Sequence, residues 1–166
     1  AWSPDGTRIA FEQYDGTDWE IKMVKADLSD SVWLVTDDVI DETNPVWSYD
    51  GSKIYVSAGD TPASYQLACL DASSAFWPGN TFSPTFLTNE PWAHNLWGIS
   101  PDDNLLLYWA SSWAAGQNEI YYLDIGSATP STGGSHQSIR VTYNSADDIK
   151  PCFIPPPTGS GSVGAE

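Results

Sequence analysis

Two pairs of adjacent carboxylates stand at the same distance from a threonine in different parts of this sequence. Each pair occupies the fifth and sixth positions after its threonine, which is Thr36 in one case and Thr142 in the other. Carboxylates with intervening water molecules are ligands that suit Ca²⁺. The spacing therefore makes four residues candidate Ca²⁺ ligands, and the sequence implies no other cofactor. The four are Asp41, Glu42, Asp147 and Asp148.

A larger set of acidic and aromatic residues falls in the same kind of short polar segment. Carboxylates could bind a cationic peptide, and exposed tryptophans can stack on a sugar or on a peptide. His94 holds the sixth position after Thr88, whereas Glu42 and Asp148 hold the sixth positions after Thr36 and Thr142. The imidazole can therefore take the place of a carboxylate as a hydrogen-bonding group. An acidic residue there can also serve the fold alone, by bonding the backbone of the neighbouring repeat. The candidate binding rim comprises Asp15, Asp18, Trp19, Asp37, Asp38, Asp41, Glu42, Trp92, His94, Trp113, Asp147 and Asp148.

The sequence lacks the motifs of the common catalytic sites. It contains no HExxH zinc motif, no P-loop, and no serine in a GxSxG turn. The glycines of GSGSVG near the carboxyl end have the wrong spacing for such a turn. We therefore expect this segment to be non-catalytic.

The candidate positions recur because the sequence is built from repeats. The stretch WSPDG begins at Trp2, returns as WSYDG at Trp47, and returns again as ISPDD at Ile99. The serines of the three copies are 45 and 52 residues apart. Each unit ends with an apolar residue followed by threonine. This threonine lies 12 residues before the serine of the next copy, as Thr36 before Ser48 and Thr88 before Ser100, and Thr142 lies 12 residues before the equivalent position of a degraded fourth start near 151. Self-similarity of this period indicates tandem structural units.

Each unit reads as four short strands, with apolar and aromatic runs bounded by Gly, Pro, Asp and Ser. Four antiparallel strands per unit are typical of a β-propeller blade, so the sequence predicts an all-β chain. Trp2, Trp47, Ile99 and Phe153 share one position on the innermost strand, and we expect them to fill the core between blades. The predicted strands are 1–3, 8–11, 20–24 and 32–36, then 46–48, 53–57, 65–70 and 85–88, then 97–100, 105–109, 119–123 and 138–142.

The stretches AWSPDGTRIAF and NPVWSYDGSKIYV resemble the WD40-like Pro-Asp-Gly repeat of TolB-type β-propellers, which also builds the propellers of prolyl oligopeptidase-like and tricorn-type peptidases. Tyr49 stands where this repeat usually has proline, and Asp103 where it usually has glycine. The resemblance covers residues 1–155 and implies three four-stranded antiparallel blades of an incomplete ring. Propellers close with about four to eight blades, and we expect about six or seven here. The blades are predicted at about 1–44, 45–96 and 97–150, with the start of a fourth at 151–155 and a linker or inserted turn at 156–166.

Composition limits the possible partners. The chain has 166 residues and a formal charge of −16, which argues against nucleic acid and anionic membrane surfaces and suits a cationic partner. No apolar run is long enough to span a membrane. We expect Cys69 and Cys152 to lie too far apart for a disulfide.

The resemblance implies a protein-binding or scaffolding segment of a secreted or periplasmic bacterial protein. The remaining blades would come from the same chain or from another protomer. An alternative is the substrate-gating propeller of a larger peptidase or other hydrolase. A minor alternative is a self-contained carbohydrate- or calcium-binding module.

Overall fold

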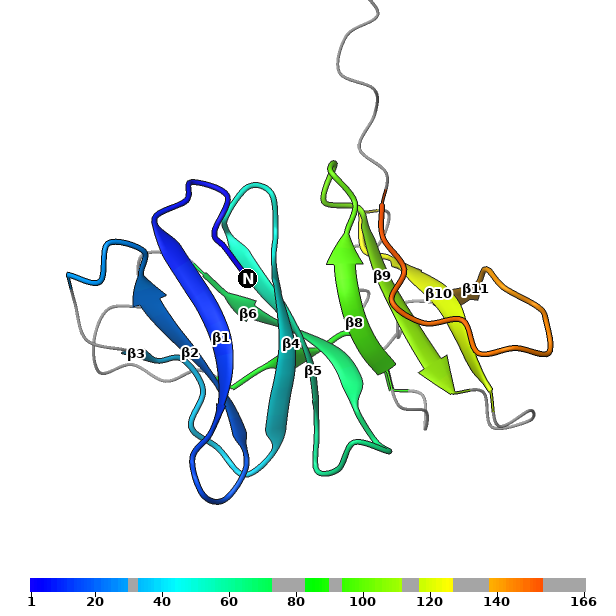
Figure 1. The fold of residues 1–166 in the computed structure, drawn as a ribbon, viewed down its shortest axis with the longest axis horizontal. Helices are drawn as coiled ribbons and strands as arrows, with labels where there is room; N and C mark the ends of the chain where they lie inside the picture. The colour runs from blue at the N-terminus through cyan, green and yellow to red at the C-terminus, as the bar shows by residue number, and fades with distance from the viewer. Residues whose placement is uncertain (30–32, 73–82, 90–93, 112–116, 127–137, 154–166) are drawn as a thin grey trace, which may run out of the picture.

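The chain folds into three antiparallel β-sheets that lie side by side, and the described residues form no helix (Figure 1). The structure is a computed structural model, and it describes residues 1–29, 33–72, 83–89, 94–111, 117–126 and 138–153. Neighbouring strands along the chain pair with one another in each sheet. The predicted all-β architecture of propeller blades is therefore confirmed.

The first sheet consists of β1 (Arg8–Tyr14), β2 (Trp19–Lys25) and β3 (Trp33–Leu34). The predicted innermost strand of this blade is present only as a short pairing at the amino end. Trp2 forms an isolated bridge with Ile9, and the Ala1 carbonyl accepts a 2.8 Å hydrogen bond from the Ala10 amide. Three strands and this short inner segment make up the first blade.

The other two sheets each have four strands, in the predicted order. The second contains β4 (Asp41–Trp47), β5 (Lys53–Gly59), β6 (Gln66–Asp71) and β7 (Thr85–Phe86). The third contains β8 (His94–Ile99), β9 (Leu105–Ser111), β10 (Asn118–Asp124) and β11 (Ser138–Arg140). Residues 151–153 form no strand, and 154–166 lie outside the described residues, so the start of a fourth blade stays a prediction.

The innermost strands β4 and β8 begin earlier than the sequence predicts. Glu42 and His94 were expected in loops, but Glu42 pairs with Ala58 and His94 pairs with Ala110. The reason is a β-bulge in each strand, between Thr43 and Val46 in β4 and between Leu96 and Gly98 in β8. A bulge shifts the register of a strand without ending it. The polar Asn-Pro sequence therefore marks an irregularity within a strand, not a loop.

Two apolar clusters join the three sheets. One packs Trp47 and Ile54 of the second blade against Ile21 and Met23 of the first. The other packs Ile99 and Leu106 of the third blade against Leu67 of the second, together with other buried residues. Burying both faces of the middle sheet in this way is what stacked blades require.

Four residues on the innermost strands were predicted to be buried between blades, and the prediction is correct for two of them. Trp47 and Ile99 are buried between blades, while Phe153 is half-buried. The prediction for Trp2 is wrong, because its side chain is 62% exposed. Trp47 packs toward the first blade, and no described sheet covers the corresponding face of the first blade itself. Cys69 and Cys152 are free thiols, as expected.

The hairpin turn of each repeat is closed by its serine and aspartate. Ser3 donates a 2.6 Å hydrogen bond to Asp5, and its oxygen accepts one from the Arg8 amide. Gly6 supplies the positive φ of 69° that the turn requires. The second copy repeats this pattern with Ser48, Asp50 and Gly51, and the third with Ser100, Asp102 and Asp103.

The two departures from the usual repeat residues are coupled in the structure. Asp103 adopts a φ of 58° in place of glycine, and its carboxylate accepts hydrogen bonds from the amides of Tyr49 at 2.7 Å and Asp50 at 3.0 Å. A proline at position 49 would have no amide hydrogen to donate. Tyr49 and Asp103 therefore form one contact between the turns of the second and third blades.

We predict that Asp103→Gly lowers the free energy of unfolding by about 0.5–1.5 kcal/mol, although glycine is the usual residue in this turn. The two amide hydrogen bonds are lost, and the relief of backbone strain offsets only part of them. Chemical denaturation of Asp103→Gly, Tyr49→Pro and the double variant would measure the coupling. Fully additive effects of the two substitutions would contradict a shared interaction.

Candidate functional site

The threonine of each repeat connects two strands through its hydroxyl group. This oxygen accepts a hydrogen bond of 2.9–3.0 Å from a backbone amide on β2, β6 or β10, the strand that pairs with the outermost strand of its blade. The same hydroxyl donates to the acidic or amide side chain one residue earlier on that strand. The donor amides and acceptor side chains are Ile21 and Glu20 for Thr36, Leu67 and Gln66 for Thr88, and Ile120 and Glu119 for Thr142.

The residue six positions after each threonine completes a recurring set that we call a blade junction. Junction one contains Glu20, Thr36 and Glu42; junction two contains Gln66, Thr88 and His94; junction three contains Glu119, Thr142 and Asp148. Glu42 and His94 belong to the innermost strand of the following blade. The threonine contact repeats in all three junctions, whereas the sixth residue has a different neighbour in each: Glu20 and Thr36 for Glu42, Tyr65 for His94, and Asn144 for Asp148.

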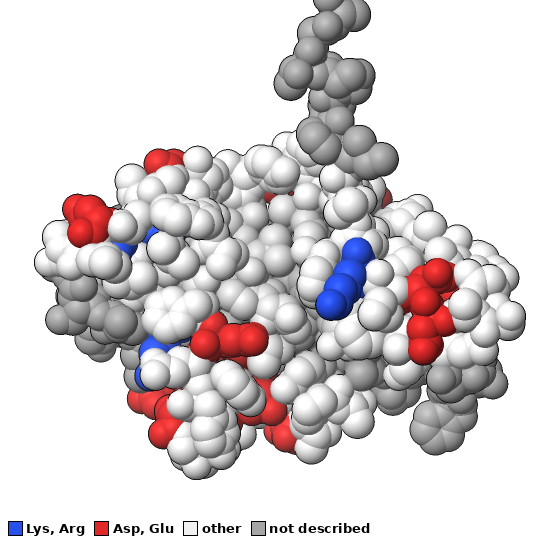
Figure 2. Space-filling view, viewed as in Figure 1, with Lys and Arg blue, Asp and Glu red and all other residues white. Residues whose placement is uncertain are grey.

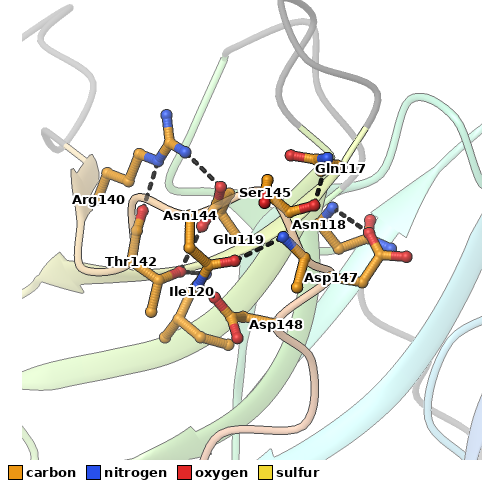
Figure 3. A network of polar contacts seen from close by, with 11 residues as sticks. Gln117, Asn118, Glu119, Ile120, Arg140, Thr142, Asn144, Ser145, Asp147 and Asp148 are labelled. Atoms are coloured by element: carbon orange, nitrogen blue, oxygen red, sulfur yellow. Dashed lines mark hydrogen bonds and ion pairs between the residues drawn. The ribbon is translucent and has the colours of Figure 1, made fainter.

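Junction three is a connected polar network (Figure 3). Arg140 forms a salt bridge with the Glu119 carboxylate and donates a 2.6 Å hydrogen bond to the Thr142 carbonyl. Asn144 donates to the Asp148 carboxylate. Asp147 accepts a 2.8 Å hydrogen bond from the Asn118 amide. The buried acid of this junction is thus balanced by a cation from the same blade.

Junction two carries no carboxylate in its three residues. Thr88 donates a 2.8 Å hydrogen bond to the Gln66 side chain, and the amide of His94 donates a 2.9 Å hydrogen bond to the Tyr65 carbonyl. The His94 side chain is fully buried, with Nδ1 at 2.9 Å from the same carbonyl oxygen. This placement gives His94 a structural hydrogen bond inside the protein, away from the solvent-exposed rim.

Junction one holds two buried carboxyl groups side by side. Glu20 accepts hydrogen bonds from the Thr36 hydroxyl and the Asp38 amide. Glu42 lies beside Thr36 and Glu20, is fully buried, and has no hydrogen-bond partner for either carboxyl oxygen. Burial raises the pKa of Glu20, and it raises the pKa of Glu42 to about 9. Two acids without a paired cation are costly in such a place.

The carboxylates predicted for the rim of the first blade do come together above junction one. The Asp18 carboxyl is buried, and burial is the main cause of its raised pKa, followed by the negative charges of Asp15, Asp41, Asp38 and Asp37. Trp19 lies at the edge of this group, with 40% of its surface exposed and its ring 5.6 Å from that of Tyr14. The structure therefore gathers six of the predicted rim residues around one junction.

The four residues first considered for Ca²⁺ do not form one site. Asp41 accepts a 2.9 Å hydrogen bond from the Trp19 amide and another of 2.9 Å from the Tyr65 hydroxyl. Asp147 makes the equivalent bond to the Asn118 amide. These two carboxylates link one blade to the chain segment that follows it, in junctions one and three respectively. The Ca²⁺ prediction for the set stays untested, and Trp92 and Trp113 of the predicted rim lie outside the described residues.

A groove that the sequence interpretation missed lies at the opposite end of β4 and β8. It has a volume of about 420 Å³ and is lined by Trp2, Pro4, Trp47, Tyr49 and Trp97, among others. Trp2 and Trp97 are 62% and 43% exposed. The tryptophans were visible in the sequence, but whether an innermost tryptophan is covered depends on which blade faces it. Because Asp41 and Trp47 are at opposite ends of β4, the groove and the acidic rim are separate surfaces.

The fold and the repeated junctions define an incomplete β-propeller, and comparison with solved structures specifies its type. The chain matches TolB from Acinetobacter baumannii with a TM-score of 0.62 at 18% identity, over 89% of this chain and 33% of that one. It matches putative TolB from Agrobacterium tumefaciens with a TM-score of 0.62 at 17% identity, over 82% of this chain and 46% of that one. Its fold is therefore that of a TolB-like β-propeller, and it spans less than half of each of these two chains.

The structure of a peptidase is also similar. A puromycin-hydrolyzing peptidase of Mycobacterium tuberculosis matches with a TM-score of 0.55 at 16% identity, over 75% of this chain and 20% of that one. No protein-family model and no curated protein sequence matches the chain. Within the described residues, no helix has the length and apolar character needed to cross a membrane.

We predict that Glu42→Gln makes the folded chain more stable at neutral and alkaline pH. The pKa of Glu42 rises from 4.5 to about 9 on folding, so the unfolded chain releases this proton at lower pH than the folded chain does. Stability is therefore lost as the pH rises from about 5 to about 9. The glutamine side chain removes this loss.

Thermal unfolding in EDTA at several pH values checks this prediction. We expect Glu42→Gln to unfold several degrees higher than the parent at pH 8 and at the same temperature below pH 5. Asp148→Asn is the matched control in junction three and should give no such gain. An equal response of the two variants to pH would contradict the assignment to Glu42.

Proposed function

We propose that this chain is a non-catalytic, protein-binding part of a TolB-like β-propeller in the envelope of a bacterium. The observation that carries the proposal is that the rim turns of the first two blades carry carboxylates and no cation. The rim turns of the first two blades, residues 15–18, 35–40 and 60–64, contain aspartates and no lysine or arginine. Figure 2 shows acidic side chains gathered along the lower edge, where the β1–β2 and β5–β6 turns lie in Figure 1.

Charges of both signs occur at the other end of the same strands. Arg8 begins β1 opposite Lys25, which ends β2, and Lys53 begins β5. Asp27 follows β2 and Asp71 ends β6, so these cations have acidic neighbours at that end. Carboxylates without cations at the rim produce a field that attracts a cationic surface to this end of the blades. We therefore propose that the rim faces a basic peptide or a basic protein surface. The remaining blades would complete the ring, from the same chain or from a second protomer.

A second candidate function is the substrate-gating propeller of a larger peptidase. The similarity to the puromycin-hydrolyzing peptidase favours it. This chain covers only 20% of that protein, so most of the peptidase has no counterpart in this sequence. Under this proposal the acidic rim would select basic substrates, and the catalytic residues would belong to another domain. An α/β-hydrolase segment in the same gene would favour the peptidase over the scaffold.

Binding of a short fluorescent peptide that alternates arginine with glycine tests the proposed rim. We expect saturable binding that weakens as salt rises from about 0.05 to about 0.3 M, because the rim charges are exposed. Replacing Asp38 and Asp60 together by asparagine should weaken binding about fivefold, since each solvent-accessible charge pair contributes up to about 1 kcal/mol.

The matched control replaces Asp27 and Asp71, which lie away from the rim, and so removes the same charge elsewhere. It should leave the affinity within about twofold of the parent. A glutamate–glycine peptide should not bind. Equal losses in the two double variants would show a general charge effect and would contradict a binding rim.

A further inference from the structure

The three blade junctions differ in how they balance buried charge. Junction three pairs Glu119 with Arg140, and junction two replaces the acid by Gln66. Junction one contains both Glu20 and Glu42, and no lysine or arginine forms an ion pair with either of them in the part of the chain that the structure describes. In junctions two and three the chain itself avoids or neutralises the buried negative charge. In junction one an external cation would have to neutralise it.

Three carboxylates of junction one and its rim have the geometry of a metal site. One oxygen each from Asp15, Glu20 and Asp37 lies within 4.8 Å of the other two. Asp15 is in the turn between β1 and β2, Glu20 is on β2, and Asp37 is in the link between β3 and β4. Glu20 is buried while the two aspartates are exposed, so the group is closed on the protein side and open to water on the other.

Glu42 is a second observation at the same place. Its carboxyl group is fully buried beside Thr36 and Glu20, and neither oxygen makes a hydrogen bond of normal geometry with the described residues. Buried polar atoms in folded proteins are almost always satisfied by protein, water or an ion. A cation held by Glu20 would supply the favourable interaction that the described residues do not give to Glu42.

We propose that Asp15, Glu20 and Asp37 bind a divalent cation, Ca²⁺ in preference to Mg²⁺, and that Glu42 supports this site from the protein interior. Ca²⁺ accepts irregular sets of protein oxygens at about 2.3–2.6 Å, whereas Mg²⁺ needs near-ideal octahedral geometry at about 2.0–2.1 Å and keeps most of its waters. The exposed side leaves space for the waters that complete a Ca²⁺ shell. Three carboxylates on a surface site suggest a dissociation constant of about 0.1–1 mM, as in extracellular Ca²⁺ modules.

The cation would join the first blade to the chain that enters the second. Asp37 precedes β4, so its coordination together with Asp15 and Glu20 fixes the link between the two sheets. This role is separate from binding a basic partner at the rim. A chain that binds Ca²⁺ but no arginine peptide would keep this inference and lose the proposed function, and the reverse result would do the opposite.

Terbium luminescence tests the site directly, with Tb³⁺ as the probe for Ca²⁺. Tyr14 and Trp19 end β1 and begin β2, on either side of the turn that carries Asp15, and they can pass excitation energy to a bound Tb³⁺. We expect saturable sensitised emission from the whole 166-residue chain, displaced by Ca²⁺ at lower concentration than by Mg²⁺.

Glu20→Gln should weaken Tb³⁺ binding at least tenfold, and it should still fold because Gln66 makes the same threonine hydrogen bond in junction two. Asp37→Asn changes an exposed side chain and should weaken binding at least fivefold. The matched control is Glu119→Gln, which makes the Glu20 substitution at the equivalent position of the third blade and should leave the affinity unchanged. Absence of saturable emission, or equal affinity in the parent, Glu20→Gln and Asp37→Asn, would overturn the proposal.

Discussion

The hydrogen bonds of one threonine hydroxyl in each repeat organise this structure. The oxygen accepts from a backbone amide and donates to the neighbouring side chain, so one small group satisfies two polar groups at the end of a blade. In junctions one and two this threonine is buried, where an unpaired amide or carboxyl would cost about 1–3 kcal/mol. The constraint explains why the interval from the threonine to the next repeat is constant while other loops vary in length. It also brings the sixth following residue, Glu42 or His94, into the boundary between blades.

The same contact is used with three different charge arrangements, and this difference concentrates the chemistry in one place. Arg140 neutralises Glu119, and Gln66 avoids the charge, whereas Glu20 and Glu42 remain together beneath the rim aspartates. The first junction is thus a structural contact and also the centre of the most acidic part of the rim. A basic partner and a divalent cation would both relieve the accumulated negative charge there, at the surface and in the interior respectively. The propeller fold alone specifies neither of them.

Much of the architecture could be predicted from the sequence because it depends on local patterns. The repeat of Ser3, Ser48 and Ser100 identified the turns, and the threonine spacing identified the blades. The interior of each junction could not be predicted, since it depends on side-chain contacts across strands. Glu42 and His94 were expected in loops, because a β-bulge interrupts the strand pattern of β4 at Asn44-Pro45 and that of β8 between Leu96 and Gly98. Trp2 was expected in the core because the equivalent residues of the other repeats are apolar. It is exposed because its burial requires a neighbouring sheet, which the repeat pattern does not supply. Glu20 was overlooked as a ligand because it lies within a strand, whereas its partners Asp15 and Asp37 follow strands.

The threonine contact is tested most directly by replacing Thr36 with valine, which keeps the shape of the side chain and removes the hydroxyl. We expect the free energy of unfolding to fall by about 1–3 kcal/mol, with faster hydrogen exchange at the Ile21 amide than at the equivalent Leu67 amide of the second blade. Thr88→Val should reverse that order of protection. If Thr36→Val unfolds at the same denaturant concentration as the parent and leaves exchange at Ile21 unchanged, the threonine hydroxyl does not organise the blade junction.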